Sequence, residues 1–177
     1  MKKRIGVQLG RFAPYHLGHE NITKSVLKQH GHNTLIMIGS SNVLNSSTPF
    51  SFDQRKEMIK CVFPNINILP LPDINPYREI KDDFDNTFEK WLAQIKQIET
   101  DLNGEFIFYG GSEEDLHYLS KKFKTQFIID RDNDGISASM IRELIQQNKY
   151  DDLDKFLNPA IVQKAIAYYN YNLSKIE

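Results

Sequence analysis

The amino-acid sequence predicts an α/β fold, in which helices cover both faces of a parallel β-sheet. Short apolar runs alternate with amphipathic segments from residue 4 to residue 130. One of these runs, TLIMIGS (34–40), is apolar on both faces, as a buried parallel strand is. The length of 177 residues suits one domain with a proper core, so we expect a single domain over 1–177.

Each expected strand is a short apolar run, and each expected helix has apolar residues at helical spacing. In order, the expected strands are RIGVQL (4–9), TLIMIGS (34–40), NINILPL (65–71), EFIFYG (105–110) and TQFIID (125–130). The expected helices between them are 18–29, 52–63, 87–99 and 113–123. From Ser139 onward we expect two or three more helices, interrupted at Asn158-Pro159. This order indicates a Rossmann-like, doubly wound parallel sheet of about five strands with C-terminal helices.

The composition excludes several classes of function. The net charge is −1 with acidic and basic residues mixed along the chain, which argues against a nucleic-acid binder that uses a large basic face. No apolar run reaches membrane-spanning length, and the apolar run at the N-terminus is too short for a secretory signal. The lone Cys61 lies in an apolar helical pattern, where we expect it to pack as a small hydrophobic residue. We therefore expect a cytoplasmic protein with no membrane or nucleic-acid partner. We also expect a homo-oligomer, to whose interface the aromatic tail YYNYNLSKIE (168–177) can contribute, although such tails also pack on their own domain.

The decapeptide GRFAPYHLGH (10–19) follows the first expected strand and has the features of an anion site. Gly10 permits a tight turn and Gly18 permits a close approach where the next helix begins. Backbone N–H groups at that helix start can face an anion. His16 and His19 are three residues apart, so they project to one side of the first helical turn. A plain connecting loop with incidental histidines remains the alternative, whereas a zinc site lacks the H-E-x-x-H pattern and a clear third ligand.

A second unusual stretch, DGISASMIRELI (134–145), lies near the C-terminus. Ser137 or Ser139 can cap a helix there, and Arg142 then falls in its first or second turn. A cation near a helix N-terminus opposes the helix dipole, unless a bound polyphosphate reverses the sign of the interaction. A solvent-exposed pairing of Arg142 with Glu143 or Asp134 explains the pattern equally well.

Taken together, H-x-G-H after the first strand and I-S-x-S-x-I-R late in the chain resemble the nucleotidylyltransferase superfamily. GRFAPYHLGH is similar to the G-R-F-x-P-x-H-x-G-H form of nicotinamide-nucleotide adenylyltransferases, in particular their archaeal-type branch. TPFSFDQRKEMI (48–59) is similar to a further segment of that family and carries Arg55. DNTFEKWL (85–92) places Trp91 where the family has an indole against the nicotinamide ring, and core packing of Trp91 is the alternative.

The resemblance implies that the chain is a nucleotidyltransferase that joins ATP and nicotinamide mononucleotide (NMN) into NAD and pyrophosphate. It implies catalytic roles for His16, His19 and Arg142, and contacts of Arg11, Arg55 and Trp91 with the second substrate. The implied ATP-binding residues are Gly10, Arg11, Phe12, Gly18, Ile136, Ser137, Ser139 and Arg142. Mg²⁺ is expected to accompany ATP on phosphate oxygens and water, with no metal site made by the protein. Asp73 and Asp85 are candidate contacts of the nicotinamide ring or ribose.

Two other functions stay open at this level. Phosphopantetheine as the acceptor would need the same histidine and arginine motifs. A regulator that binds nucleotides without turnover is the alternative outside enzymes, although it has no need of transition-state donors such as His16 and His19.

Overall fold

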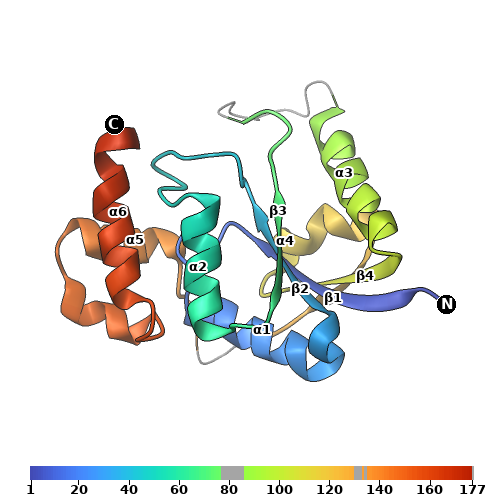
Figure 1. The fold of residues 1–177 in the computed structure, drawn as a ribbon, viewed down its shortest axis with the longest axis horizontal. Helices are drawn as coiled ribbons and strands as arrows, with labels where there is room; N and C mark the ends of the chain where they lie inside the picture. Colours follow the sequence, from blue (N-terminus) through green and yellow to red (C-terminus); the bar gives the residue numbers. More distant parts are fainter. Residues whose placement is uncertain (77–85, 130–132, 134, 177) are drawn as a thin grey trace.

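The computed structural model describes residues 1–176 except 77–85, 130–132 and 134. Its strands form a five-stranded sheet in the order β3-β2-β1-β4-β5, and every neighbouring pair runs parallel (Figure 1). The strands are β1 (Lys3–Gly10), β2 (Thr34–Gly39), β3 (Asn67–Leu71), β4 (Gly104–Gly110) and β5 (Lys124–Phe127). The predicted α/β class and the five-stranded parallel sheet are therefore confirmed.

The helices also follow the expected order, with one difference. They are α1 (Leu17–His30), α2 (Phe52–Val62), α3 (Thr87–Asp101), α4 (Glu113–His117), α5 (Ala138–Gln146) and α6 (Val162–Ile176), with short 3₁₀ turns η1 (Gly31–Asn33), η3 (Leu119–Lys121) and η4 (Tyr150–Lys155). The helix expected over 113–123 is instead split into α4 and η3. The tighter turn of η3 brings Leu119 and Phe123 into the same core cluster as Leu116 of α4.

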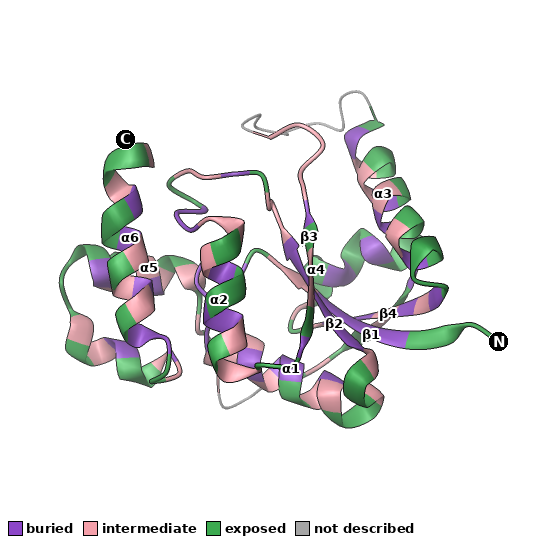
Figure 2. Cartoon of the chain, in the orientation of Figure 1, coloured by how far each residue is buried: buried purple, intermediate pink, exposed green. Residues whose placement is uncertain are grey.

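The sheet separates two hydrophobic layers. Leu35 and Met37 of β2 point to the layer covered by α3 and α4, whereas Ile36 and Ile38 point to the layer covered by α2, α5 and α6. Helix α1 covers β4 on the latter side through contacts of Ile22 and Val26. Figure 2 shows the result, with buried strands in the middle and helices that are buried along one stripe only.

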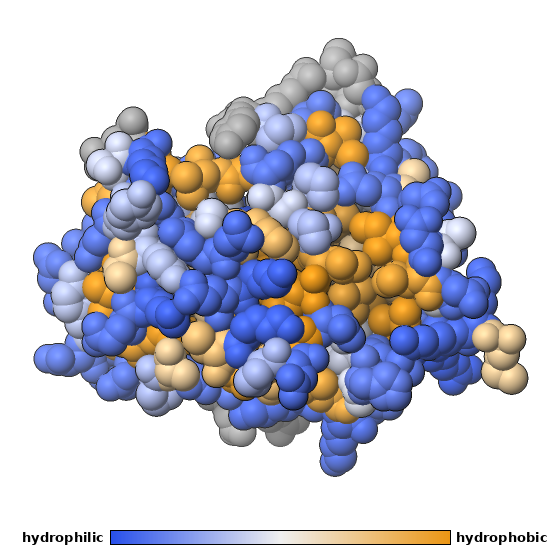
Figure 3. Space-filling view, viewed as in Figure 1, coloured by the Kyte–Doolittle hydropathy of each residue, from blue (hydrophilic) through white to orange (hydrophobic). Residues whose placement is uncertain are grey.

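One prediction about the core is wrong. Cys61 is exposed, because the buried side of α2 is formed by Arg55, Met58 and Ile59, and Cys61 lies on another side of the helix. On the face seen in Figure 3, hydrophilic side chains form most of the surface and apolar ones gather mainly between α2 and α3. No helix among the described residues is long and apolar enough to cross a membrane.

The order of the strands places a topological switch point beside β1. The chain adds β2 and β3 on one side of β1 and then returns to add β4 and β5 on the other side. Sheets of this kind bind ligands outside the carboxyl ends of the strands at the switch point. The decapeptide 10–19 starts at that end of β1.

Candidate active site

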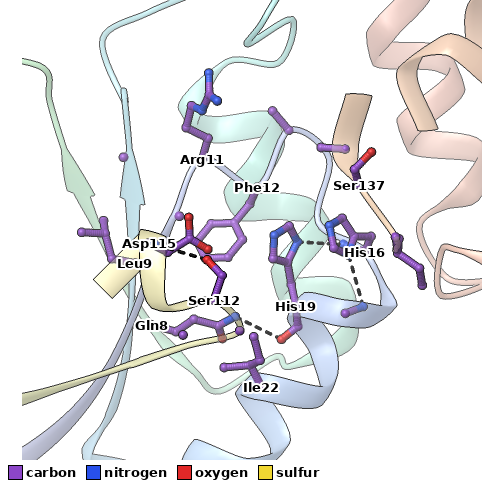
Figure 4. Close-up of a pocket in the computed structure, with 18 of the residues that line it drawn as sticks. Gln8, Leu9, Arg11, Phe12, His16, His19, Ile22, Ser112, Asp115 and Ser137 are labelled. Atoms are coloured by element: carbon purple, nitrogen blue, oxygen red, sulfur yellow. Dashed lines mark hydrogen bonds between the residues drawn. The ribbon is translucent and has the colours of Figure 1, made fainter. Parts of the chain in front are cut away.

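A cavity of about 740 Å³ opens at the carboxyl ends of the strands. This volume lies within the range of small-molecule sites. Residues that follow β1, β2, β3 and β4 line it, together with residues of α1, α3, α4 and α5. Of the residues singled out in the sequence, the cavity lining includes Gly10, Arg11, Phe12, His16, Gly18, Trp91, Ile136, Ser137, Ser139, Arg142 and Asp73. The structure thus brings the two motif stretches into one cavity (Figure 4).

The loop that leaves β1 is held by its own aromatic side chains. Phe12 has a positive φ of 52° and is nearly fully buried, and its ring meets the ring of His19 edge-on at 4.9 Å. Tyr15 is fully buried, and its ring stacks on the ring of His19 with the two centroids 5.6 Å apart. A left-handed backbone conformation is unfavourable for a residue such as Phe12, so the contacts around the loop must hold it in place.

His16 and His19 form a reciprocal cap at the start of α1. His16 is the N-cap residue, and its Nδ1 accepts the backbone N–H of Gly18 at 3.1 Å. The backbone N–H of His16 in turn donates to Nδ1 of His19 at 3.2 Å, and the two rings stack 3.6 Å apart. A Cβ at position 18 would lie 3.0 Å from the His16 ring, so glycine suits this position. The backbone N–H groups of His16 and Gly18 therefore already have partners within the chain.

The capping geometry determines which ring nitrogens remain for a ligand. Because both Nδ1 atoms accept backbone N–H groups, the proton of each neutral ring lies on Nε2. Burial lowers the pKa of His16 to about 4. Burial, followed by the proximity of His16, lowers the pKa of His19 as well. At neutral pH, the pair therefore provides two neutral imidazoles with Nε2–H donors at the cavity.

A buried polar network lies beneath the first turn of α1. The backbone carbonyl of His19 accepts hydrogen bonds from Nε2 of Gln8 at 3.1 Å and from the hydroxyl of Thr23 at 3.0 Å. The hydroxyl of Tyr15 is 2.7 Å from that of Thr23. Burial raises the pKa of the Tyr15 hydroxyl, so this group remains protonated and available as a donor. The network joins β1, the motif loop and α1 directly behind the histidine pair.

Arg142 connects the second motif to the first. Its Nη1 donates to the carbonyl of Ala13 at 2.8 Å, and its Nη2 donates to the hydroxyl of Ser139 at 3.1 Å. Ser137, rather than Ser139, is the N-cap of α5 and accepts the backbone N–H of Met140. Burial lowers the pKa of Arg142, and the nearby charge of Arg11 lowers it further. Two guanidinium groups that repel each other beside a helix N-terminus form a favourable place for an anion.

Arg55 is placed differently from the expectation. It is fully buried and is absent from the residues that line the cavity. Its guanidinium donates to the carbonyls of Arg11, Gly39 and Ser40 at 2.8 to 3.0 Å, and its Nε donates to that of Ser51 at 3.3 Å. Arg55 therefore holds the loops after β1 and β2 together.

The remaining predicted residues lie on the side of the cavity near α3. Trp91 is half-buried. It packs against the core cluster that α3 and α4 cover, and it also lines the cavity. Trp91 therefore takes part in core packing and also has a surface in the cavity. Asp73 lines the cavity as well. Asp85 lies outside the described residues.

Sequence reasoning missed the residues after β4. Ser112 and Asp115 line the cavity, and the hydroxyl of Ser112 caps α4 by accepting the backbone N–H of Asp115 at 3.1 Å. The signal was present in GGSEED (110–115), which directly follows a parallel strand whose carboxyl end lies beside that of β1.

Residues near the C-terminus complete the start of α1. The backbone N–H of Leu17 donates to the carbonyl of Phe156 at 2.9 Å. Nδ2 of Asn158 donates to the buried carboxylate of Glu20 at 3.2 Å, and Lys24 pairs with the same carboxylate at 3.0 Å. The helix that carries both histidines is therefore anchored by the segment that connects α5 to α6.

The described part of the chain contains no group of three His, Cys, Asp or Glu side chains placed to hold a metal ion. The acidic side chains of the cavity lining, Asp73 and Asp115, follow different strands.

The sequence model of the cytidylyltransferase-like family matches residues 7–144, which include both motif stretches. The chain belongs to this family. Within the cytidylyltransferase-like proteins, a nicotinamide-nucleotide adenylyltransferase of Saccharolobus solfataricus is 36% identical over 77 residues, which are 39% of this chain and 44% of that protein. The match thus spans less than half the length of this curated relative.

Three solved structures of two proteins share the fold of the chain. A bifunctional NMN adenylyltransferase/ADP ribose pyrophosphatase from Francisella tularensis has a TM-score of 0.65 at 20% identity, over 98% of this chain and 55% of that chain. A structure of that protein complexed with AMP and a manganese ion has a TM-score of 0.61. A nicotinic acid mononucleotide adenylyltransferase from Plasmodium falciparum has a TM-score of 0.58 at 19% identity, over 99% of this chain and 98% of that chain.

Proposed function

We propose that this protein transfers the adenylyl group of ATP to NMN, forming NAD and pyrophosphate. A phosphate oxygen of NMN attacks the α-phosphorus of ATP, the new P–O bond forms, and the bond to the β-phosphate oxygen breaks with release of pyrophosphate. The phosphate of NMN is already a nucleophile near neutral pH, so the reaction needs no general base. Positioning and stabilisation of charge then supply the catalysis.

The observation that carries this proposal is the histidine pair. Two neutral imidazoles with their protons on Nε2 are preorganised donors, and burial keeps them neutral across the physiological pH range. Donors of this kind stabilise the charge that develops on the oxygens around the α-phosphorus. We assign His16 and His19 to that role.

The other charged groups of the cavity fit the remaining phosphates. Arg142, Ser139 and the N-terminus of α5 would hold the β- and γ-phosphates of ATP. The guanidinium and the N-terminal end of the helix dipole are both positive there, so both attract an anion. Exposed Arg11 would hold the phosphate of NMN. Trp91 offers an aromatic face to the nicotinamide ring, which is a cation in NMN.

Mg²⁺ would enter with ATP as part of the substrate, bound by phosphate oxygens and water and neutralising part of their charge. The manganese ion in the complex of the Francisella tularensis protein supports a divalent cation in this role.

A coupled assay tests the proposal. The protein receives ATP, Mg²⁺ and NMN, and alcohol dehydrogenase reports NAD as it forms. We expect NAD formation in the wild type and a decrease of kcat by about 10²- to 10³-fold in His19→Ala, the loss typical of one transition-state donor. His32→Ala is the matched control, because His32 is exposed and lies outside the cavity lining.

Parallel reactions distinguish the other two functions. Release of pyrophosphate with phosphopantetheine but not with NMN would change the acceptor and keep the adenylyl transfer. Binding of ATP without turnover of either acceptor would favour the nucleotide-binding regulator.

A further inference from the structure

A chain of buried polar side chains closes around His19. Tyr15 of the motif loop, Thr23 of α1 and Gln8 of β1 form this chain, and each is at most 3% exposed. At one end, the ring of Tyr15 stacks on the ring of His19 with an angle of 22° between the two planes. At the other end, the amide of Gln8 donates to the backbone carbonyl of His19 at 3.1 Å (Figure 4). The chain therefore contacts both the ring and the backbone of His19.

The direction of each hydrogen bond in this chain follows from the groups that form it. The carbonyl of His19 can only accept, so the NH₂ group of Gln8 faces it, and Oε1 of Gln8 faces the hydroxyl of Thr23. Thr23 donates its one hydroxyl proton to Oε1 of Gln8 or to the carbonyl of His19, which are both acceptors only. The hydroxyl of Tyr15 must therefore donate to that of Thr23, and burial raises the pKa of Tyr15, so the proton is retained.

The helix does not need the bond from Gln8 in order to form. An α-helix supplies each interior carbonyl with a donor four residues later, so the carbonyl of His19 has a partner without Gln8. Burial of polar side chains costs desolvation, and apolar groups of the same shape would fill this space about as well. A fully connected polar network instead specifies a single geometry, because each of its bonds has a direction.

The histidine pair depends on such a geometry. The rings of His16 and His19 lie 3.6 Å apart, and Nδ1 of His19 accepts the backbone N–H of His16 at 3.2 Å. Both contacts place the Nε2–H donors of the pair, and both change if the first turn of α1 moves relative to the sheet. Gln8 is the side chain of β1 that ties this turn to the sheet.

We infer that Gln8 is a positioning residue, which acts through the backbone carbonyl of His19 and is itself oriented by Thr23 and Tyr15. The inference rests on the proposed function. Gln8 keeps Nε2–H of His19 in place while charge develops on the oxygens around the α-phosphorus. A displaced donor of this kind loses stabilisation of the transition state, so its loss lowers kcat rather than the affinity for substrates.

The main test measures kcat and the KM values for ATP and NMN in Gln8→Met, which keeps the length of the side chain and removes its amide. We expect kcat to fall by about tenfold, less than in His19→Ala, and both KM values to stay within about threefold of the wild type. Gln126→Met serves as the control, because Gln126 lies exposed on β5 and outside the described cavity lining. Raised KM values with an unchanged kcat would overturn the inference and indicate that Gln8 contacts a substrate.

A double variant shows whether Gln8 acts through His19. In the His19→Ala background, Gln8→Met should change kcat by less than about twofold, because the donor that Gln8 positions is already absent. A further loss of about tenfold in this background would show that the two residues act independently, and it would overturn the inference.

Two variants of Thr23 test how Gln8 is oriented. Thr23→Val keeps the shape of the side chain but removes the hydroxyl, so kcat should fall as in Gln8→Met. Thr23→Ser keeps the hydroxyl and should retain most of the wild-type kcat. Equal losses in the two variants would contradict a role for the hydroxyl.

The ring of His19 can also be observed without catalysis. A ¹⁵N–¹H NMR spectrum of the imidazole groups reports the hydrogen bonding of each histidine, so Gln8→Met should shift the resonances of His19 and leave those of exposed His32 unchanged. Unchanged resonances of His19 would overturn the inference even if the enzyme were slower. Absence of turnover with NMN in the wild type would instead refute the proposed function, and the NMR comparison would then decide whether Gln8 positions His19.

Discussion

A protonated His16 is incompatible with its own position, because its Nδ1 then has no lone pair to accept the N–H of Gly18. Burial lowers the pKa of His16 to about 4, whereas an unfolded histidine titrates near pH 6.5. Between these two values the unfolded chain binds more protons than the folded one. The stabilisation from this residue is therefore complete above about pH 6.5 and is lost as the pH falls toward 4.

Urea denaturation at about pH 7.5 and about pH 5 measures this effect. The free energy of unfolding should be lower at the acidic pH, and His16→Gln should show a smaller difference between the two conditions. The exposed His32→Gln variant should keep the wild-type difference. An identical pH dependence in wild type and His16→Gln would contradict the lowered pKa.

Arg55 gives a second prediction at the level of a single residue. Arg55→Met should lower the free energy of unfolding by about 3 kcal/mol or more, because it leaves the carbonyls of Arg11, Gly39 and Ser40 without their charged donor. Chemical denaturation measures this loss, and Lys56→Met on the exposed side of the same helix is the control. If Arg55→Met raised only the KM for NMN and left stability unchanged, the phosphate contact expected from the sequence would be correct after all.

Among the elements, α5 depends on one cap. Ser137→Ala removes the hydroxyl that accepts the N–H of Met140 and should lower the free energy of unfolding by about 1 kcal/mol. Ser174→Ala, at an exposed position on α6, should change it by less than about 0.5 kcal/mol. A loss that is equal in the two variants would show that the cap contributes nothing.

The elements also show which features can be predicted from sequence. The strands were predictable because a buried parallel strand is a short apolar run, as in TLIMIGS. The split of the helix expected over 113–123 was not, because the spacing of three residues between Leu116 and Leu119 fits both an α-helix and a 3₁₀ turn. The position of Cys61 was missed for a related reason, since an apolar neighbourhood in sequence does not specify which side of α2 is buried.

The site was predictable in its motifs but not in its contacts. GRFAPYHLGH and the segment around Arg142 indicated one anion site, and the structure brings them into one cavity. The partners of Arg55, however, lie in loops after two different strands and at the start of α2, and no local pattern encodes such a meeting. The same holds for Phe156 and Asn158, which contact α1 from more than 130 residues away.

At the scale of the whole molecule, ligand binding should be measurable as stability. A ligand present at 100 times its dissociation constant adds about 2.7 kcal/mol to the free energy of unfolding, so NAD should raise the melting temperature. ATP should raise it as well, and Arg142→Ala should reduce the shift at the same ATP concentration, because it removes the cation proposed to hold the β- and γ-phosphates and the link to Ala13. Arg4→Ala, at the opposite end of β1, should leave the shift unchanged, and a loss there would show a nonspecific effect.

The hydrogen bond from Leu17 to Phe156 has a consequence for the order in which the protein matures on the ribosome. The first motif is translated early and all five strands are present once residue 127 has emerged, but the acceptor for the amide next to His16 is synthesised about thirty residues later. A nascent chain that has formed its sheet therefore still lacks the acceptor that completes the start of α1. We expect nucleotide binding to require this contact, so binding should begin only after the segment around Phe156 has left the exit tunnel.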